Sequence, residues 1–306
     1  MRLVSFRATD DHDGPWCAGV RLGSMVVGAD DAIAGDAIEA ELGRGPISVR
    51  AMIGALGRAP DSIASIASVQ RGAEKVVDHK GLAVDAITLG PPVPDPDKIL
   101  CVGLNYVDHA SESDLDTTQV PTIFAKFRNS LVGPGAEIVI PAITSEVDYE
   151  GEIAVVIGRR GREIPVEAAL MHVAGAMPFN DVSARDLQMQ TTQWTAGKAI
   201  DTFAPCGPEL VLMDEIGDLQ NLELVTRLNG EVVQQATSAD MIHSVAEVIS
   251  FLSKVMTLEV GDVIATGTPS GVGFVREPPL FLLPRDVVEV EVKGLGLLSS
   301  PVVAGK

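Results

Sequence analysis

The pattern of hydrophobic and polar positions predicts a protein rich in β-strands. Valines alternate with glutamates over residues 288–292, which is typical of a half-buried antiparallel strand. Residues 153–157 (Ile-Ala-Val-Val-Ile) form a continuous apolar, mostly β-branched run, which indicates a buried strand. Asn229-Gly230 separates two strand-like segments within residues 224–235 and is the strongest hairpin signal in the chain. The pattern therefore favours sheets, with few helices between them.

The region up to about Gly90 is predicted to be a small α+β unit. Short strands are expected at residues 3–6, 17–22 and 25–27, and a short helix at residues 49–56. A longer helix is expected over residues 61–71, with Asp61 as its cap, Ile63 on its apolar face and Gly72 at its end. Later in the chain, Asp240 is expected to cap another amphipathic helix.

Four prolines within residues 91–96 indicate a boundary. Such a segment forms neither a helix nor a central strand, so it is predicted to be a stiff, extended linker. We therefore divide the chain into a small N-terminal α+β domain with its linker, residues 1–92, and a larger domain, residues 93–306.

Composition and charge narrow the class of partners. The formal net charge of −19 argues against binding to nucleic acid or to anionic membrane surfaces. The N-terminal residues lack the apolar core of a signal peptide, and no apolar run is long enough to span a bilayer. The three cysteines show no ligand-like spacing, which is typical of free thiols in a reducing compartment. We expect a cytoplasmic protein.

Two glutamates at the start of the buried strand indicate a cation site. Side chains alternate along a strand, so Glu150 and Glu152 point the same way, with Gly151 between them. Two like charges that face together repel unless a positive charge lies between them. Asp181, which follows an apolar segment, is a plausible third carboxylate, although it can also be a helix N-cap. An all-oxygen set favours Mg²⁺ or Mn²⁺, with Ca²⁺ also compatible.

His109 and Glu112 are candidates for proton transfer. Three residues apart, they share one face if the segment is helical, and a carboxylate beside an imidazole raises its pKa. A solvated His–Glu pair on an exposed turn is the alternative. The surrounding segment up to Val120 is polar, so we expect a mobile lid that closes as a short helix.

Two lysines and a glycine-rich loop are further candidates for the site. Lys126 follows a short apolar segment, although a single lysine is more often on the surface. Lys198 lies in an irregular segment, residues 194–208, of the kind that often lines a site. The loop at residues 267–273 lacks the lysine of a phosphate-binding loop, but its backbone amides and Thr268 could bind a carboxylate.

From about Pro96 to Val303 the sequence resembles the fumarylacetoacetate hydrolase superfamily. The resemblance is carried, in the family's order, by residues 103–112, 148–152, 180–186, 197–203 and 266–273. It implies a β-rich α+β fold, a mixed β-sandwich-like roll, in a protein that is usually a homodimer and holds Mg²⁺ or Mn²⁺. The strand at residues 99–103 lacks the further aspartate ligand of the members nearest to fumarylacetoacetate hydrolase itself. This difference favours the shorter bacterial branch, which acts on smaller 2-oxo acids.

The resemblance also implies roles for individual residues. The metal ligands would be Glu150, Glu152 and Asp181, and the acid/base dyad would be His109 with Glu112. Lys198 would face the developing charge, and the substrate-side groups would also include Lys126, Gln188, Gly267 and Thr268. Asp148 is expected to be a supporting acid rather than a ligand.

These roles predict an enzyme that acts on a small-molecule 2-oxo acid through an enolate stabilised by the metal. Hydrolysis of a C–C bond in an acylpyruvate-type substrate ranks first. Decarboxylation or isomerisation of a dicarboxylic 2-oxo acid ranks close behind, because all three reactions share the enolate. The alternative from another class is a binding module with a structural Ca²⁺ site, although such a module needs neither the His109–Glu112 pair nor Lys198.

Overall fold

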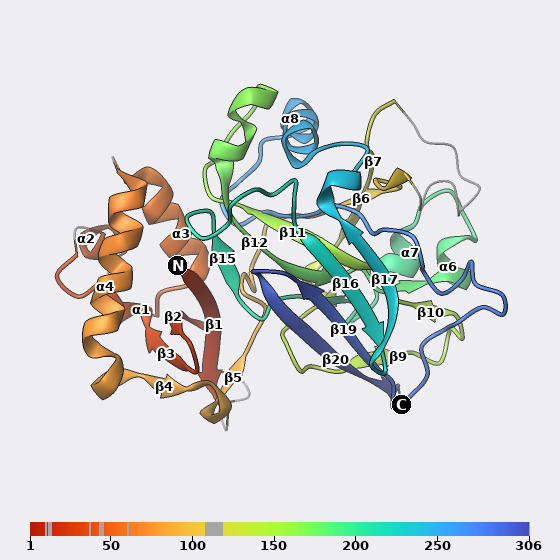
Figure 1. Cartoon of the computed structure of the whole chain (residues 1–306), viewed down its shortest axis with the longest axis horizontal. Helices are drawn as coiled ribbons and strands as arrows, with labels where there is room; N and C mark the ends of the chain where they lie inside the picture. Colours follow the sequence, from red (N-terminus) through yellow and green to blue (C-terminus); the bar gives the residue numbers. More distant parts are fainter. Residues whose placement is uncertain are drawn as a thin grey trace.

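The computed structural model describes residues 1–9, 11, 14–36, 38–42, 46–59, 61–107 and 119–305 (Figure 1). It is a mixed, strand-rich structure in which the sheets remain open, so the predicted β-rich α+β class is confirmed. His109 and Glu112 lie outside the described residues. No helix in the described part is long and apolar enough to cross a membrane.

A long sheet connects the N-terminal region with the rest of the chain. Its order is β4-β3-β2-β1-β15-β12-β11-β18-β6-β7, and β5 pairs with β1 beside this path. The strands are β1 (Arg2–Ala8), β2 (Cys17–Leu22), β3 (Met25–Gly28), β4 (Leu82–Ala83), β5 (Ile87–Leu89), β6 (Ile99–Gly103), β7 (Thr122–Lys126), β11 (Gly151–Ile157), β12 (Val173–Asn180), β15 (Leu210–Leu212) and β18 (Val263–Ala265). The predicted strands at residues 3–6, 17–22 and 25–27 are therefore confirmed.

A second sheet packs against the middle of the first one. Its order is β17-β16-β19-β20-β9, from β16 (Glu223–Leu228), β17 (Glu231–Thr237), β19 (Val287–Val292), β20 (Gly296–Ala304) and β9 (Ile138–Ile140). Ile153 and Val155 of β11 share a core with Leu224 of β16 and Val290 of β19. The predicted hairpin at Asn229-Gly230 and the alternating strand at residues 288–292 are confirmed.

Short elements complete the fold. Two small sheets pair β10 (Val147–Asp148) with β13 (Ser183–Ala184) and β8 (Leu131–Val132) with β14 (Ala204–Pro205). The α-helices are α1 (Ala29–Ala32), α2 (Glu39–Leu42), α3 (Val49–Arg58), α4 (Ser62–Lys80), α6 (Arg185–Gln188), α7 (Thr195–Lys198) and α8 (Val245–Val255). The 3₁₀-helices are η1 (Val84–Ala86), η2 (Arg128–Ser130), η3 (Val166–His172) and η4 (Ser238–Asp240).

Helix α4 begins where it was predicted but ends later. The side chain of Asp61 accepts a hydrogen bond from the backbone N of Ala64, as a cap does. The prediction that Gly72 ends the helix is wrong, because α4 continues to Lys80. A Cβ at Gly72 would lie 2.0 Å from the carbonyl oxygen of Ala32, so this glycine allows α1 to approach α4 closely. Ile63 is 73% exposed, so its predicted place on the apolar face is also wrong.

The predicted cap of α8 is also wrong. Asp240 does not cap this helix; it ends η4, where it forms a capping box with Thr237. The N-cap of α8 is Ser244, which forms a second capping box with Glu247. The Ser-x-x-Glu pattern was present in the sequence, and it is the stronger start signal because it satisfies two backbone N–H groups instead of one.

The proline-rich segment lies against the body of the protein. Pro91, Pro92 and Val93 are buried, and the hydroxyl of Ser5 donates to the carbonyl oxygen of Pro92 at 2.9 Å. Strand β1 pairs with β15, so one sheet continues across both sides of this segment (Figure 1). The division into residues 1–92 and 93–306 stays a prediction.

Candidate metal centre and active site

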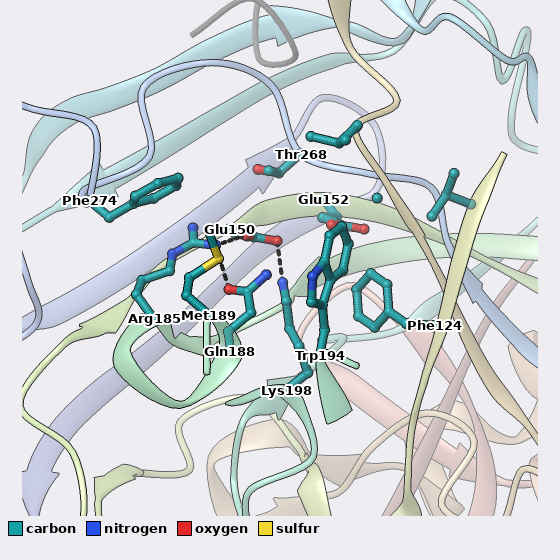
Figure 2. Close-up of a pocket in the computed structure, with 13 residues that line it drawn as sticks. Phe124, Glu150, Glu152, Arg185, Gln188, Met189, Trp194, Lys198, Thr268 and Phe274 are labelled. Carbon is teal, nitrogen blue, oxygen red and sulfur yellow. Dashed lines mark hydrogen bonds and ion pairs between the residues drawn. The ribbon is translucent and has the colours of Figure 1, made fainter. Parts of the chain in front are cut away.

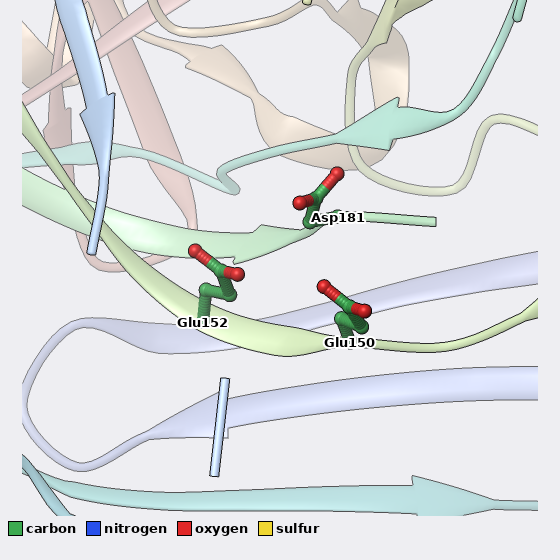
Figure 3. A group of neighbouring side chains, drawn as sticks. All are labelled: Glu150, Glu152 and Asp181. Atoms are coloured by element: carbon green, nitrogen blue, oxygen red, sulfur yellow. The ribbon is translucent and has the colours of Figure 1, made fainter. Parts of the chain in front are cut away.

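Three carboxylates meet where β11 begins and β12 ends (Figure 3). Glu150 directly precedes β11, Glu152 lies on it, and Asp181 directly follows β12. The two strands are antiparallel, and Gly151 pairs with Asn180, so these ends coincide. One oxygen from each carboxylate lies within 4.8 Å of the others, and all three residues are buried. The sequence-predicted ligands are therefore brought together in space.

Gly151 permits this arrangement from the opposite face of the strand. A Cβ at this position would lie 1.9 Å from Oγ1 of Thr226 on β16. The missing side chain thus lets the second sheet approach directly behind the two glutamates. Any larger residue would push the sheets apart at the point where the carboxylates are held.

Two buried lysines neutralise part of the negative charge. The ammonium of Lys198 lies 2.7 Å from Oε2 of Glu150 and 2.9 Å from Oδ2 of Asp181. The ammonium of Lys126 contacts Oδ1 of Asp181 and donates to the carbonyl oxygen of Val182 at 3.0 Å. Burial lowers the pKa of Lys126, whereas Lys198 has a raised pKa because Asp181 and Glu150 outweigh its burial.

Glu152 carries the charge that is least compensated. Within the described part of the chain, its carboxylate accepts one hydrogen bond, from the backbone N of Gly267 at 2.9 Å, and forms no ion pair. Burial, with Asp181 and Glu150 nearby, raises the pKa of Glu152 well above its usual value. Carboxylate oxygens are the donors that a hard divalent cation prefers, so the triad fits Mg²⁺ or Mn²⁺.

A pocket opens onto Glu150 and Glu152, two members of the triad (Figure 2). Its polar lining residues are Glu150, Glu152, Arg185, Gln188, Lys198 and Thr268. Phe124 and Trp194 form one aromatic wall, with their rings in an edge-to-face arrangement 5.3 Å apart. Phe274 forms another wall, and the guanidinium of Arg185 lies over its ring at 4.3 Å. The pocket thus offers both cations and carboxylates to a small polar ligand.

Arg185 is a site residue to which the sequence reading assigned no role, although it lies in the segment 180–186 that carries the resemblance. Its Nη1 lies 2.7 Å from Oε1 of Glu150 and donates to Oε1 of Gln188 at 3.0 Å. Its Nε donates to Oδ2 of Asp148 at 2.9 Å. Asp148 also accepts hydrogen bonds from the backbone N of Gly273 and of Phe274. Asp148 therefore anchors Arg185 and the glycine-rich loop, as expected of a supporting acid.

The predicted substrate-side residues divide into two groups. Gln188 and Thr268 line the pocket, as does Lys198. Lys126 is not among the described residues that line it; its ammonium contacts Asp181, which does not line the pocket either. Gly267 acts through its backbone N, which donates to Glu152. The substrate-binding roles, and the dyad of His109 and Glu112 outside the described residues, stay predictions.

Fold and site together define a class of protein in which a buried carboxylate triad that can bind a divalent metal lies beside a pocket, where β11 begins and β12 ends. Residues 98–303 match the family described as fumarylacetoacetate (FAA) hydrolase, C-terminal. The chain belongs to the fumarylacetoacetate hydrolase family. The proteins of this family are enzymes that act on small oxo acids, and a buried acidic triad of this kind can bind a divalent metal.

Individual relatives cover most or all of the chain. It is 47% identical over 219 residues to the human protein named oxaloacetate tautomerase FAHD2A, mitochondrial. The matched residues make up 71% of this chain and 70% of that relative. Among solved structures, fumarylacetoacetate hydrolase from Exiguobacterium antarcticum is 34% identical, with a TM-score of 0.80. The 2-hydroxyhepta-2,4-diene-1,7-dioate isomerase from Mycobacterium marinum is 31% identical, with a TM-score of 0.73. Both structures match over 100% of each chain.

Proposed function

We propose that this protein is a divalent-metal-dependent enzyme that interconverts the keto and enol forms of a small dicarboxylic 2-oxo acid of the oxaloacetate type. The observation that carries the proposal is the pocket in which Glu150 and Glu152 of the buried triad lie beside Lys198 and Arg185. The name of the human relative, an oxaloacetate tautomerase, supports this substrate class. The sequence alone favours C–C hydrolysis, but with this relative we rank the isomerase-type reaction first and hydrolysis second.

Three residues would hold the ion. Glu150, Glu152 and Asp181 supply the carboxylate oxygens, and Mg²⁺ or Mn²⁺ fits this hard donor set. A bound divalent cation supplies Lewis-acid polarisation of the carboxylate and keto oxygens of a 2-oxo acid. The two lysines hold the carboxylates of Glu150 and Asp181 in one orientation.

Proton transfer would take place at C3 of the substrate. His109, oriented by Glu112, would remove the C3 proton of the keto form and deliver it to the C2 oxygen to give the enol, with the reverse transfer from the enol. The ammonium of Lys198 lines the pocket, and its raised pKa keeps it charged against the oxygen that gains negative charge. The edge-to-face pair of Phe124 and Trp194 forms an apolar wall that excludes water from this oxygen.

The second carboxylate of the substrate would be held on the opposite side of the pocket. Arg185 and Gln188 line it there, and the hydrogen bond between them orients both side chains. Since the Oε1 of Gln188 accepts from Arg185, Gln188 would donate to the carboxylate through its amide nitrogen, and the Arg185 guanidinium would add positive charge beside it. This arrangement favours a dicarboxylic over a monocarboxylic 2-oxo acid.

Hydrolysis of an acylpyruvate-type C–C bond is the second candidate. The hydrolase from Exiguobacterium antarcticum matches the whole chain, and cleavage would use the same enolate as tautomerisation. In that reaction His109 would activate water instead of removing the C3 proton. Cytoplasmic location and a homodimer stay predictions as well; several mammalian relatives are named as mitochondrial proteins.

The test is a panel of 2-oxo acids assayed with Mg²⁺, Mn²⁺ or a chelator. Keto–enol exchange of oxaloacetate is followed by the ultraviolet absorbance of the enol, and pyruvate release is followed separately to detect decarboxylation or hydrolysis. We expect metal-dependent exchange of oxaloacetate that is abolished in Glu150→Gln. Faster release of pyruvate from an acylpyruvate than exchange of oxaloacetate would instead favour hydrolysis. A protein that binds metal but turns over none of the panel would favour a structural Ca²⁺ module.

A further inference from the structure

Gln234 reaches the site from behind, out of the second sheet. It lies on β17 and is only 2% exposed, although neighbouring Gln235 is exposed. Its Oε1 accepts a hydrogen bond from the backbone N of Gly151 at 2.9 Å. Its Nε2 donates to Oγ1 of Thr268 at 2.8 Å and to the carbonyl oxygen of Pro269 at 2.9 Å. One amide thus joins the strand that carries the glutamates to the loop that lines the pocket.

Thr268 closes this link into a ring of hydrogen bonds. Its hydroxyl accepts from Gln234 and donates to the carbonyl oxygen of Gly151 at 2.9 Å. The ring therefore runs from Gly151 N to Gln234, from Gln234 to Thr268, and from Thr268 back to Gly151 O. A hydroxyl has a single proton, and here it is given to the backbone. Thr268 is thus held in place by the ring, and its hydroxyl proton is not available to a ligand.

The ring of hydrogen bonds sets the distance between β11, which carries Glu152, and the loop that contains Thr268. Gly151 lies between Glu150 and Glu152, and Thr268 follows Gly267, whose backbone N donates to Glu152. The triad has further supports, because Lys198 and Arg185 contact Glu150 and both lysines contact Asp181. In the described residues, the side-chain hydrogen bonds that hold Thr268 to the strand are those of this ring. Its loss should therefore move the loop more than the triad.

We propose that Gln234 is a positioning residue that holds the 267–269 loop over the triad and thereby sets the affinity for the 2-oxo acid. The kinetic part rests on the proposed function, whereas the effects on the loop and on metal binding do not. The structure predicts a division of effects: the substrate is bound less tightly, while the metal is bound as before. A residue that only stabilised the fold would weaken both.

Gln234→Met tests this division, because methionine has a similar length but forms none of the three strong hydrogen bonds. We expect KM for oxaloacetate to rise about tenfold, the size of effect that one or two misplaced polar contacts produce. We expect kcat to change less than about threefold, and the dissociation constant for Mn²⁺, measured by calorimetry, less than about twofold. Hydrogen exchange by mass spectrometry should be faster in peptides that cover residues 267–273.

Gln235→Met is the matched control, since it makes the same substitution one residue away at an exposed position. It should leave KM, Mn²⁺ affinity and loop exchange unchanged. Thr268→Val is a second variant that removes the same ring while it keeps the side-chain shape, and it serves if Gln234→Met folds poorly. Because both residues act through one ring, the double variant should raise KM no more than the larger single effect.

The proposal is overturned if Mn²⁺ affinity falls as much as substrate affinity, or if loop exchange is unchanged in a folded Gln234→Met protein. It is also overturned if the effects of Gln234→Met and Thr268→Val on KM multiply. If the unsubstituted protein turns over no 2-oxo acid, the proposed function fails. The loop-exchange and Mn²⁺ measurements then still decide whether Gln234 holds the loop without supporting the triad.

Discussion

Two strands of the long sheet, β1 and β11, are equally well buried but differ in what they bury. Around β1, Leu3 is fully buried among apolar side chains from the first sheet and the N-terminal helices. At the start of β11, Glu152 is only 1% exposed, yet it lies among other charged groups. Burial of an apolar side chain is favourable by itself, whereas burial of a charge costs free energy unless a partner compensates it.

This difference shows where stability and function separate in one sheet. Strand β1 contributes packing, and none of its residues lines the site pocket. Strand β11 retains a carboxylate, Glu152, without an ion pair in the described residues, which is unfavourable for the metal-free fold and suited to a cation. The free energy gained from apolar packing around β1 offsets part of the cost of burying this charge.

The largest effect is expected at the carboxylates where β11 begins. Glu150→Gln keeps the shape of the side chain but removes a ligand charge, so kcat/KM should fall on the order of 10³-fold, about 4 kcal/mol of transition-state stabilisation. Initial rates with saturating Mn²⁺ measure this change. Glu231→Gln, at an exposed position of the Asn229-Gly230 hairpin, is the control and should keep full activity. Equal activity in both variants would show that Glu150 has no role in the reaction.

The next effect is expected in the apolar core around β1, where a substitution should lower stability and leave activity unchanged. Leu3→Ala leaves a cavity in the N-terminal core, so the free energy of unfolding should fall by about 2–5 kcal/mol. Denaturant titration measures the fall, and kcat/KM well below the melting temperature should be unchanged. Ile63→Ala on α4 removes a side chain that is 73% exposed and should cost less than about 0.5 kcal/mol. A loss of activity in Leu3→Ala would show that packing around β1 is coupled to the site at β11.

Metal binding should stabilise the protein through Glu152. Mn²⁺ at a hundredfold excess over its dissociation constant should add about 2.7 kcal/mol to the free energy of unfolding. In Glu152→Gln this gain should be largely lost. The chelated variant should be at least as stable as the chelated native protein, because it lacks a charge that burial disfavours. Thermal melting with Mn²⁺ and with chelator gives all four values; a destabilised chelated variant would contradict the interpretation.

The smallest effect is expected from the cap of α4, far along the sheet from the triad. Asp61→Ala removes the acceptor for the backbone N of Ala64 and should cost about 1 kcal/mol of stability. Asp78→Ala, an exposed acid near the other end of the same helix, should cost less. Both variants should keep native kcat/KM. A change in activity with Asp61→Ala would mean that the N-terminal helices influence the pocket.

Local patterns predicted most of the elements. The β11 run, the Asn229-Gly230 hairpin and the Asp61 cap depend on neighbours in the chain, and all three are present. One prediction that failed depends on a distant contact. Gly72 does not end its helix but allows the close approach of Ala32, which lies far away in the sequence. The cap predicted at Asp240 is wrong for a local reason, because the capping box of Ser244 with Glu247 starts α8 instead.

The sequence by itself determined that carboxylates meet at the start of β11. Strand alternation places Glu150 and Glu152 on one face, and two facing carboxylates require a positive charge between them whatever the rest of the fold does. Only the tertiary structure decided what completes the site. The antiparallel register of Gly151 with Asn180 brings Asp181 to the glutamates, and packing of the second sheet brings Gln234 to Thr268. Such contacts join residues far apart in the chain, and no local pattern of residue types specifies which distant segments will meet.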